Sequence, residues 1–500
     1  MALTRLPTEL LDNIITHTLA EGFEGVALTC RRIYALCTPF IERHNTLRSH
    51  FSSFNYLHQW HDPSYTIRTA FDLITRIAVE PIVARYVRHA DFKIDSLSIR
   101  GRPREFGADV HCGDAVARLL AASPYLKQAG LDWQEYYNEI EEDLQARLYS
   151  QRAAAFLLTL LPNIETSVLP RRWKPLSVTD KLIDTVVRKA KQWHHSSCDT
   201  PGLAHTARFE PYLALLPAEQ FDLAWAIPFL ALPRMRCFYG PSCVAMDDGG
   251  HKSIDASKDQ YRSGFGEALE AVDLVGCCID EVGIADFLKH ATRLRSLRYS
   301  HSTKRNSGPP DDDWDICKFV TAIEREVGSH IGELSVSMRE LRGSIAPGRV
   351  SMSGFQRLRK LELPLEIAVC NITAAAARPA ATLPNESLAD GDGSTDYHEL
   401  DDEETFIVDL VPASVSQLSL LSRGTDDHAK VLDVMFRHFA ARKESTLPAL
   451  EEIQLSCPNS ADDEYKEQCA RLLAETEKVG VYLDLKHWPA CVTMTWIGND

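Results

Sequence analysis

Cysteine and histidine are the residue types whose spacing in this chain could form a metal site. Three short clusters bring them close together: His194-His195 with Cys198, Cys237 with Cys243, and Cys277 with Cys278. A structural zinc site needs four ligands at tetrahedral geometry, and no cluster here supplies its own second half. We therefore expect no metal and no other cofactor. Most of the 13 cysteines are interpreted as small buried hydrophobic residues in a reducing compartment.

An acidic stretch matches part of a calcium-binding EF-hand loop. Asp390, Asp392 and Gly393 stand at the third, fifth and sixth positions of such a loop, and Glu399 stands at the twelfth. Leu388 occupies the first position, where a carboxylate must coordinate the ion. We interpret the stretch as a solvated acidic loop.

Motifs for covalent and phosphate chemistry are absent from the sequence. It contains no Gly-x-Ser-x-Gly, no phosphate loop ending in Gly-Lys-Ser/Thr, no His-Glu-x-x-His and no Rossmann glycine fingerprint. We therefore expect a protein that is not an enzyme and that acts by binding other proteins.

Composition limits the partners further. The net charge is −16 and the pI is about 5.6, whereas a general nucleic-acid binder needs a basic face. The sequence has no apolar run of about 18 residues, the length that spans a membrane, and its start lacks the apolar core of a signal peptide. We expect a cytoplasmic or nuclear protein with no nucleic-acid partner and no membrane partner.

Two short apolar helical patterns lie near the start of the chain. Pro7 fits the first position of a helix, because its missing N–H would be unpaired there. The first pattern predicts one apolar stripe, formed by Leu10, Leu11, Ile14 and Ile15. The second pattern predicts another face, formed by Val26, Cys30, Ile33 and Tyr34. A segment of this length cannot bury a core by itself. Its apolar face therefore needs a partner, which is either the rest of the chain or another protein.

The same residues resemble a known adaptor-binding motif. Leu-Pro-x-Glu-Leu-Leu at 6–11, the pair Ile14-Ile15 and Leu-Thr-Cys-Arg-Arg at 28–32 resemble the F-box of cullin–RING ubiquitin ligases. The resemblance implies that this segment binds the Skp-type adaptor of a cullin complex. The implied contact residues are Leu6, Pro7, Leu10, Leu11, Ile14, Ile15, Leu28, Cys30 and Ile33.

An apolar triad with spacing i, i+3, i+5 recurs along the second half of the chain and predicts a series of strands. The copies are Leu269/Val272/Leu274, Leu294/Leu297/Tyr299, Ile331/Leu334/Val336, Leu358/Leu361/Leu363, Val415/Leu418/Leu420 and Leu450/Ile453/Leu455. Looser relatives lie at 156–165 and 230–238. Several copies follow a helical stretch, as in leucine-rich repeats, and Leu-Leu-Pro-Asn-Ile-Glu at 160–165 resembles the helix-to-strand corner of fungal F-box proteins. We expect an α/β fold in which an irregular leucine-rich-repeat-like solenoid follows the helical F-box. The alternative is a compact mixed α/β domain.

These interpretations define two regions. Residues 1–47 are expected to form the F-box-like helical motif, and residues 48–500 the leucine-rich-repeat-like substrate-binding region. We also expect a strand over 84–94, a disordered acidic insertion at about 373–405 and a smaller loop over 300–313.

The leading hypothesis is a substrate-recognition subunit of an SCF-type ubiquitin ligase, which binds the adaptor through its F-box and an unknown target protein through its repeats. The alternative is a repeat scaffold without a ligase role, whose N-terminal helices cap the solenoid. In a cap the apolar stripe would lie against the first repeat helices, whereas in an adaptor-binding motif much of it would be exposed.

Overall fold

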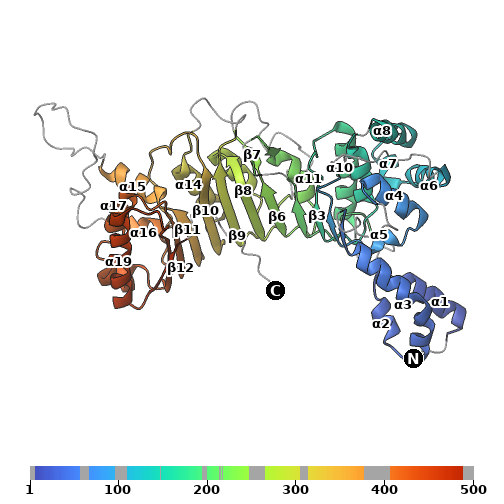
Figure 1. Ribbon diagram of the computed structural model, residues 1–500, viewed down its shortest axis with the longest axis horizontal. Coiled ribbons are helices and arrows are strands. Elements are labelled where there is room, and N and C mark those ends of the chain that lie inside the picture. Colours follow the sequence, from blue (N-terminus) through green and yellow to red (C-terminus); the bar gives the residue numbers. More distant parts are fainter. Residues whose placement is uncertain are drawn as a thin grey trace, which may run out of the picture. The chain divides into compact units, whose positions relative to one another are not determined.

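The computed structural model describes residues 6–56, 67–95, 110–146, 148–193, 200–212, 215–216, 218–246, 265–304, 313–376 and 406–487. These residues form an α/β protein with a large parallel sheet of 14 strands (Figure 1). The expectation of an α/β fold with a parallel sheet is therefore confirmed. The chain divides into two compact units: residues 1–212 with 225–238 form unit 1, and residues 213–224 with 239–500 form unit 2.

Unit 1 begins with three helices and continues with helices that alternate with short strands. Its strands follow the order β1-β2-β3-β4-β6, and these pairs are parallel. The helices are α1 (Thr8–Thr18), α2 (Phe23–Ala27), α3 (Arg31–Phe51), α4 (Ala70–Val79), α5 (Val83–Tyr86), α6 (Val110–Ala121), α7 (Pro124–Gln128), α8 (Trp133–Gln145), α9 (Gln151–Thr159), α10 (Ser177–Gln192) and α11 (Ile227–Leu230). The strands are β1 (Ser53–Asn55), β2 (His89–Asp91), β3 (Thr166–Val168), β4 (Arg208–Glu210) and β6 (Cys237–Pro241), of which only the first two residues of β6 belong to this unit.

Unit 2 repeats a strand-and-helix pattern in which neighbours in the sheet are also neighbours in sequence. The order is β8-β9-β10-β11-β12-β13-β14, and β7 pairs with both β5 and β8. The strands are β5 (Phe221–Asp222), β7 (Cys243–Ala245), β8 (Ala271–Ile279), β9 (Ser296–Ser302), β10 (Glu333–Glu340), β11 (Lys360–Pro364), β12 (Gln417–Leu421), β13 (Glu452–Ser456) and β14 (Tyr482–Lys486). The helices are α13 (Glu281–Leu288), α14 (Ile316–Val327), α15 (Glu366–Ala376), α16 (Phe406–Leu410), α17 (Asp426–Met435), α18 (Phe439–Thr446) and α19 (Asp463–Lys478); a 3-10 helix (Leu223–Ala226) crosses the unit boundary.

Every predicted apolar triad lies at a strand of unit 2, and all of its members are buried. Leu334 on β10 is the register partner of Leu297 on β9 and of Leu361 on β11. In the same way Leu418 on β12 pairs with Leu361 and with Ile453 on β13. Positions along these strands alternate between buried and partly exposed, so each triad places its side chains on the buried face of the sheet.

A repeated hydrogen-bond pattern connects the starts of successive strands within each unit. The carbonyl oxygen of Gly332 accepts from the N–H groups of Arg359 (2.8 Å) and Lys360 (3.2 Å), and the carbonyl of Arg359 accepts in turn from the next strand. The same two-to-one pattern recurs at the carbonyls of Ser52, Arg88, Glu165, Ala207, Glu270, Arg295 and Ser416. We call this pattern the strand-start ladder. Because buried backbone groups must be paired, each strand start fixes the position of the next.

Three predicted element boundaries differ from the structure. The strand expected over 84–94 is wrong, because Val83–Tyr86 form α5 and only His89–Asp91 form β2. The loop expected over 300–313 begins too early, because β9 continues to Ser302 in parallel register with β10. The insertion expected from residue 373 also begins too early, since the alanine-rich stretch extends α15 to Ala376, as the high helix propensity of alanine favours.

The expected division at residue 47 falls inside α3, which continues to Phe51. Unit 1 also holds much more than the F-box-like motif, because it extends to residue 212. Several other expectations lie outside the described residues: the acidic loop around Asp390, the cluster of His194 to Cys198, and most of the insertion at 373–405.

The buried triads give a direct prediction about stability. Leu361→Ala removes a fully buried side chain from the middle of β11 and should cost about 2–5 kcal/mol, since the surrounding strands cannot collapse onto the cavity. Lys360→Ala on the same strand is the matched control; it removes an ion pair with Glu333 (3.3 Å) that is partly open to solvent and should cost at most about 1 kcal/mol. Chemical denaturation of the two variants checks this, and equal losses would contradict the assignment of the two faces.

Candidate functional site

The three N-terminal helices share a core of their own, and Figure 1 shows α1, α2 and α3 grouped together. The core residues are Ile15, Leu19, Phe23, Ala27, Ile33 and Cys37. Ile82, which follows α4 in sequence, packs against this cluster as a partly buried neighbour. The expectation that so short a segment cannot bury a core is therefore wrong, because three helices and one residue of the adjoining segment together enclose it.

The predicted stripe on α1 is divided between two faces. Leu11 and Ile15 are each only 1% exposed, whereas Leu10 is 49% exposed and Ile14 is half-buried. The cause is helical geometry: residues four apart share a face, while adjacent residues are turned by about 100°. The interpretation of the four residues as a single stripe is therefore wrong.

The second predicted face is divided in the same way. Ile33 is buried in the core, whereas Tyr34 is 51% exposed. Of the other implied contact residues, Pro7 is exposed and Leu6 and Cys30 are half-buried. Leu28, at the end of α2, is 80% exposed. Leu10, Leu28 and Tyr34 together form what we call the outer patch, an apolar set that the described part of the chain leaves uncovered.

The members of the outer patch belong to the same end of the three-helix group. Arg32 donates a hydrogen bond from Nη2 to the carbonyl oxygen of Leu6 at 3.3 Å, which brings the start of α1 to the start of α3. Leu10 lies in the first turn of α1, Leu28 directly precedes α3, and Tyr34 lies in the first turn of α3. A helical turn rises only 5.4 Å, so Leu10 and Tyr34 each lie within about one turn of the two helix starts that this bond joins.

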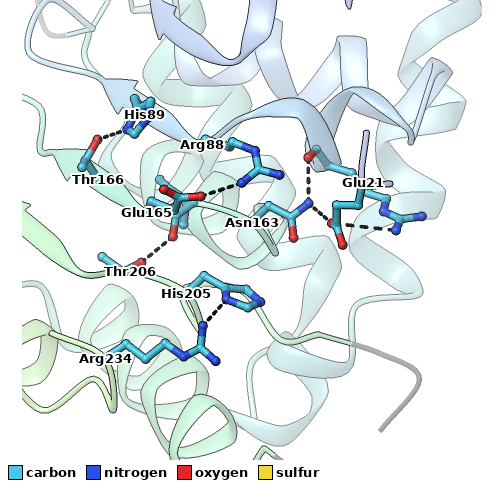
Figure 2. A network of polar contacts seen from close by, with 11 residues as sticks. Glu21, Arg88, His89, Asn163, Glu165, Thr166, His205, Thr206 and Arg234 are labelled. Carbon is cyan, nitrogen blue, oxygen red and sulfur yellow. Dashed lines mark hydrogen bonds and ion pairs between the residues drawn. The ribbon is translucent and has the colours of Figure 1, made fainter. Parts of the chain in front are cut away.

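A polar clamp holds the turn after α1 to the rest of unit 1 (Figure 2). Asn163, three residues before β3, donates from Nδ2 to the carbonyl of Arg85 at 2.8 Å and to the carboxylate of Glu21. The guanidinium of Arg85 lies 3.8 Å from the same carboxylate, and it also donates to the carbonyl of His17 at 3.4 Å. Asn163 belongs to the Leu-Leu-Pro-Asn-Ile-Glu segment at 160–165, which joins α9 to β3. The side chain at this corner therefore positions the N-terminal helices.

The clamp continues along the strand starts of unit 1. Figure 2 shows Arg88 paired with Glu165 at 2.6 Å, and His89 hydrogen-bonded to Thr166 at 3.0 Å. These pairs join the start of β2 to the start of β3, beside the ladder contact at the carbonyl of Arg88. The polar side chains and the backbone ladder thus fix the same register.

A second contact fixes α3 to α5. His44 Nδ1 and the hydroxyl of Tyr86 are 2.8 Å apart, and both side chains are buried. Burial lowers the pKa of His44, although Glu24 opposes the shift, and burial raises the pKa of Tyr86. A neutral imidazole and a neutral phenol are therefore the stable forms at this contact. Arg43 and Glu80 form an ion pair nearby at 2.6 Å.

The clamp predicts how the N-terminal helices respond to a single change. Asn163→Leu keeps a side chain of similar volume but removes both hydrogen bonds, which leaves the carbonyl of Arg85 unpaired and should cost about 1–3 kcal/mol. Amide hydrogen exchange in α1 and α2 should become faster, while exchange in α17 of unit 2 should not change. Thr166→Val is the control, because it removes a more exposed hydrogen bond. Unchanged exchange in α1 would contradict the clamp.

Unit 1 also contains a buried polar cluster that no sequence motif indicates. Asp95 accepts a hydrogen bond at Oδ1 from the N–H of Ala70, the first residue of α4, at 2.9 Å. Its other oxygen and the hydroxyls of Tyr56 and Tyr149 are buried and find no hydrogen-bond partner among the residues that the structure describes. Burial raises the pKa of Asp95 to about 7, although the Ala70 hydrogen bond opposes the shift. A lone aspartate gives no periodic signal, so only the structure reveals this group.

Asp95 gives a prediction about pH. Its pKa is higher in the folded state than the ordinary value of 3.8, so its contribution to stability is complete below about pH 4 and is lost as the pH rises to about 7. Asp95→Asn should therefore match the wild type at pH 4 and exceed it at pH 8, by up to the order of 4 kcal/mol. Melting temperatures across this range check the effect, with the half-buried Asp91→Asn as control. A difference that does not depend on pH would contradict it.

Comparison with protein-family models finds no match, and comparison with curated protein sequences finds none either. Within the described ranges, no group of three or more His, Cys, Asp or Glu side chains is placed to hold a metal ion. No helix in the same part of the chain combines the length and apolar character needed to cross a bilayer.

Proposed function

We propose that the protein is the substrate-recognition subunit of a cullin–RING ubiquitin ligase of the SCF type. In this proposal the outer patch binds the Skp-type adaptor, and the strand-and-helix region binds a target protein in the cytoplasm or nucleus. The chain itself makes no covalent bond. It raises the local concentration of the target near the charged conjugating enzyme, which converts a bimolecular encounter into a reaction within one complex.

The observation that carries the proposal is the exposure of the outer patch. Leu10, Leu28 and Tyr34 are between 49% and 80% exposed, although the helices that bear them bury a core of their own. Clustered exposed apolar side chains typically mark a surface that binds another protein. Leu10 and Leu28 are also positions that the F-box resemblance implies, so the chemistry and the sequence pattern support the same surface.

The alternative, a scaffold whose N-terminal helices cap a solenoid, needs a polar outer face on those helices. The outer patch is apolar. Of the stripe expected to lie against the repeats in a cap, Leu11 and Ile15 face the interior of the three-helix group, whereas Leu10 is exposed. These features favour the adaptor-binding hypothesis over the cap.

We infer further that the strands and helices of unit 2 stack as an irregular leucine-rich-repeat-like solenoid. The strand order from β8 to β14 follows the sequence without reversal, whereas a doubly wound α/β domain reverses its order near the middle of the sheet. Adjacent helices also pack together, as α13 does with α14 and α17 does with α19.

The partly exposed face of this sheet is the proposed target-binding surface. Its side chains hold one another in place: Ser335 and Ser419 donate to the two carboxylate oxygens of Glu362 at 2.5 and 3.3 Å. Gln417 donates to Glu452 at 3.0 Å. These bonds link neighbouring strands and hold the polar side chains in fixed positions, which lowers the entropy cost of binding.

Co-purification with a Skp-type adaptor tests the proposal. The wild-type chain should retain the adaptor, and Leu10→Asp combined with Leu28→Asp should reduce retention by at least about tenfold, since charges then replace apolar contacts at the interface. Both residues are exposed, so the variant should melt at the temperature of the wild type.

Val282→Asp is the matched control, because Val282 is also an exposed apolar residue (44%) but lies on α13 of unit 2. This variant should retain the adaptor fully. A wild-type chain that captures no adaptor, or a double variant that captures as much as the wild type, would contradict the proposal.

A further inference from the structure

Four exposed arginines lie immediately before two strands of unit 2. Two of them fall in the three residues before β9 and two in the three residues before β11: Arg293, Arg295, Arg357 and Arg359. Each pair flanks the first leucine of an apolar triad, Leu294 or Leu358, and both leucines are fully buried. The leucine is held in the core, so each pair stays at the surface beside it. We call these four residues the arginine group.

The strand-start ladder places the two arginine pairs on either side of one glycine. The carbonyl oxygen of Arg295 accepts from the N–H of Gly332 at 2.9 Å, and the carbonyl of Gly332 accepts from the N–H of Arg359 at 2.8 Å. The pairs are therefore two strand spacings apart, about 10 Å. A Cβ built at Gly332 would meet only one atom within 4 Å, the carbonyl oxygen of Arg295 at 3.5 Å. The space between the two pairs is open.

The arginine group has no counter-charge of its own. Among the residues that the structure describes, none of its four side chains forms an ion pair or a hydrogen bond. The carboxylate that begins β10, Glu333, is engaged by Lys360 at 3.3 Å and by the hydroxyl of Ser296 at 3.3 Å. The positions that continue the ladder on either side are Glu270 and Ser416. The positive charge is therefore confined to the starts of β9 to β11.

This local charge has the opposite sign to the chain as a whole, whose net charge is −16. A guanidinium group presents a rigid fork of N–H donors, which binds a carboxylate through two parallel hydrogen bonds. Four unpaired guanidinium groups on strand starts about 10 Å apart therefore attract a ligand that carries several negative charges.

The small extent of the arginine group distinguishes a short anionic ligand from a long one. Duplex nucleic acid carries a negative charge about every 1.7 Å, so its phosphates would extend past the four arginines to Glu270 and into the field of an acidic protein. A short acidic segment of a protein keeps its charge beside the arginines. An extended chain advances about 3.3 Å per residue, so carboxylates three residues apart match the spacing of the two pairs.

We propose that the arginine group binds a short segment of a partner protein that is rich in aspartate and glutamate. The segment crosses the starts of β9, β10 and β11 in an extended conformation and passes over Gly332. Its first carboxylates pair with Arg293 and Arg295, and those three residues further along pair with Arg357 and Arg359. The surface continues onto the partly exposed face of the sheet, and the proposal rests on the proposed function only in taking this partner to be the target.

Fluorescence anisotropy of a labelled peptide with the full chain tests the proposal. The probe carries Glu-Glu-Ser-Glu-Glu between glycine and serine residues, and in the control peptide every glutamate is glutamine. The wild-type chain should bind the probe and not the control, and added salt should weaken binding because it screens exposed charges. Arg295→Gln combined with Arg359→Gln should weaken binding about tenfold, since two exposed ion pairs are lost.

Two further variants separate the arginine group from net charge. Arg423→Gln combined with Arg471→Gln changes the net charge equally, but these exposed arginines already lie 3.9 Å from Glu366 and 2.7 Å from Glu467. This control should bind the probe as the wild type does. Gly332→Gln fills the open space without changing the charge and should also weaken binding. All three variants should melt at the temperature of the wild type, because each change is at the surface.

Several results would overturn the proposal. They are a wild-type chain that does not bind the probe, and an equal loss in the two double-arginine variants. Tighter binding of a single-stranded RNA of equal charge would assign the surface to nucleic acid, and binding of a phosphoserine peptide alone would assign it to phosphate. Binding that appears only after the carboxylates between 386 and 404 are neutralised would assign it to the chain's own acidic stretch. The assay contains no adaptor, so its outcome is independent of adaptor binding.

Discussion

The strand-start ladder is the interaction on which the rest of the structure depends. One carbonyl oxygen receives two N–H groups from the start of the next strand, and this pattern recurs at most strand starts of each unit. A parallel sheet has no tight turns to set its register, so the register must come from elsewhere. The ladder provides the register at most strand starts, and the buried triads then pack side by side along the sheet.

The ladder also connects the N-terminal helices to the sheet. Its first carbonyl in the chain belongs to Ser52, the residue that caps α3. The clamp of Glu21, Arg85 and Asn163 reinforces the same connection from the other end of the helices. The three-helix group is therefore held by its outgoing chain, by this polar corner and by the contacts of α3 with Glu80 and Tyr86, and the outer patch stays largely exposed within the described chain. This arrangement is the physical basis of the proposed adaptor binding.

The sequence alone was sufficient to predict the structural features that repeat along the chain. A buried strand beside a helix needs apolar residues at fixed spacing, so the triads at Leu297, Leu361 and Ile453 could be located before their partners were known. Single polar residues give no such period. The burial of Asp95, and the bond of Asn163 with Glu21 across 142 residues, depend on tertiary contacts that no local pattern encodes.

The division of the α1 stripe between core and surface shows, within a single helix, that a local sequence pattern does not encode tertiary contacts. Helical spacing identified Leu10 and Leu11 as apolar neighbours, but it could not assign one to the core and the other to the surface. That choice depends on how α2 and α3 pack against α1. It matters for function, because only the outward residue can contact a partner without unfolding the helices.

Amide hydrogen exchange at the strand starts tests the central claim most directly. If the ladder fixes the register, the amides of Gly332, Glu333, Arg359 and Lys360 should exchange as slowly as those inside β10 and β11. Rapid exchange at these positions, while the strand interiors remain protected, would show that the register is set by side-chain packing alone and would contradict the account.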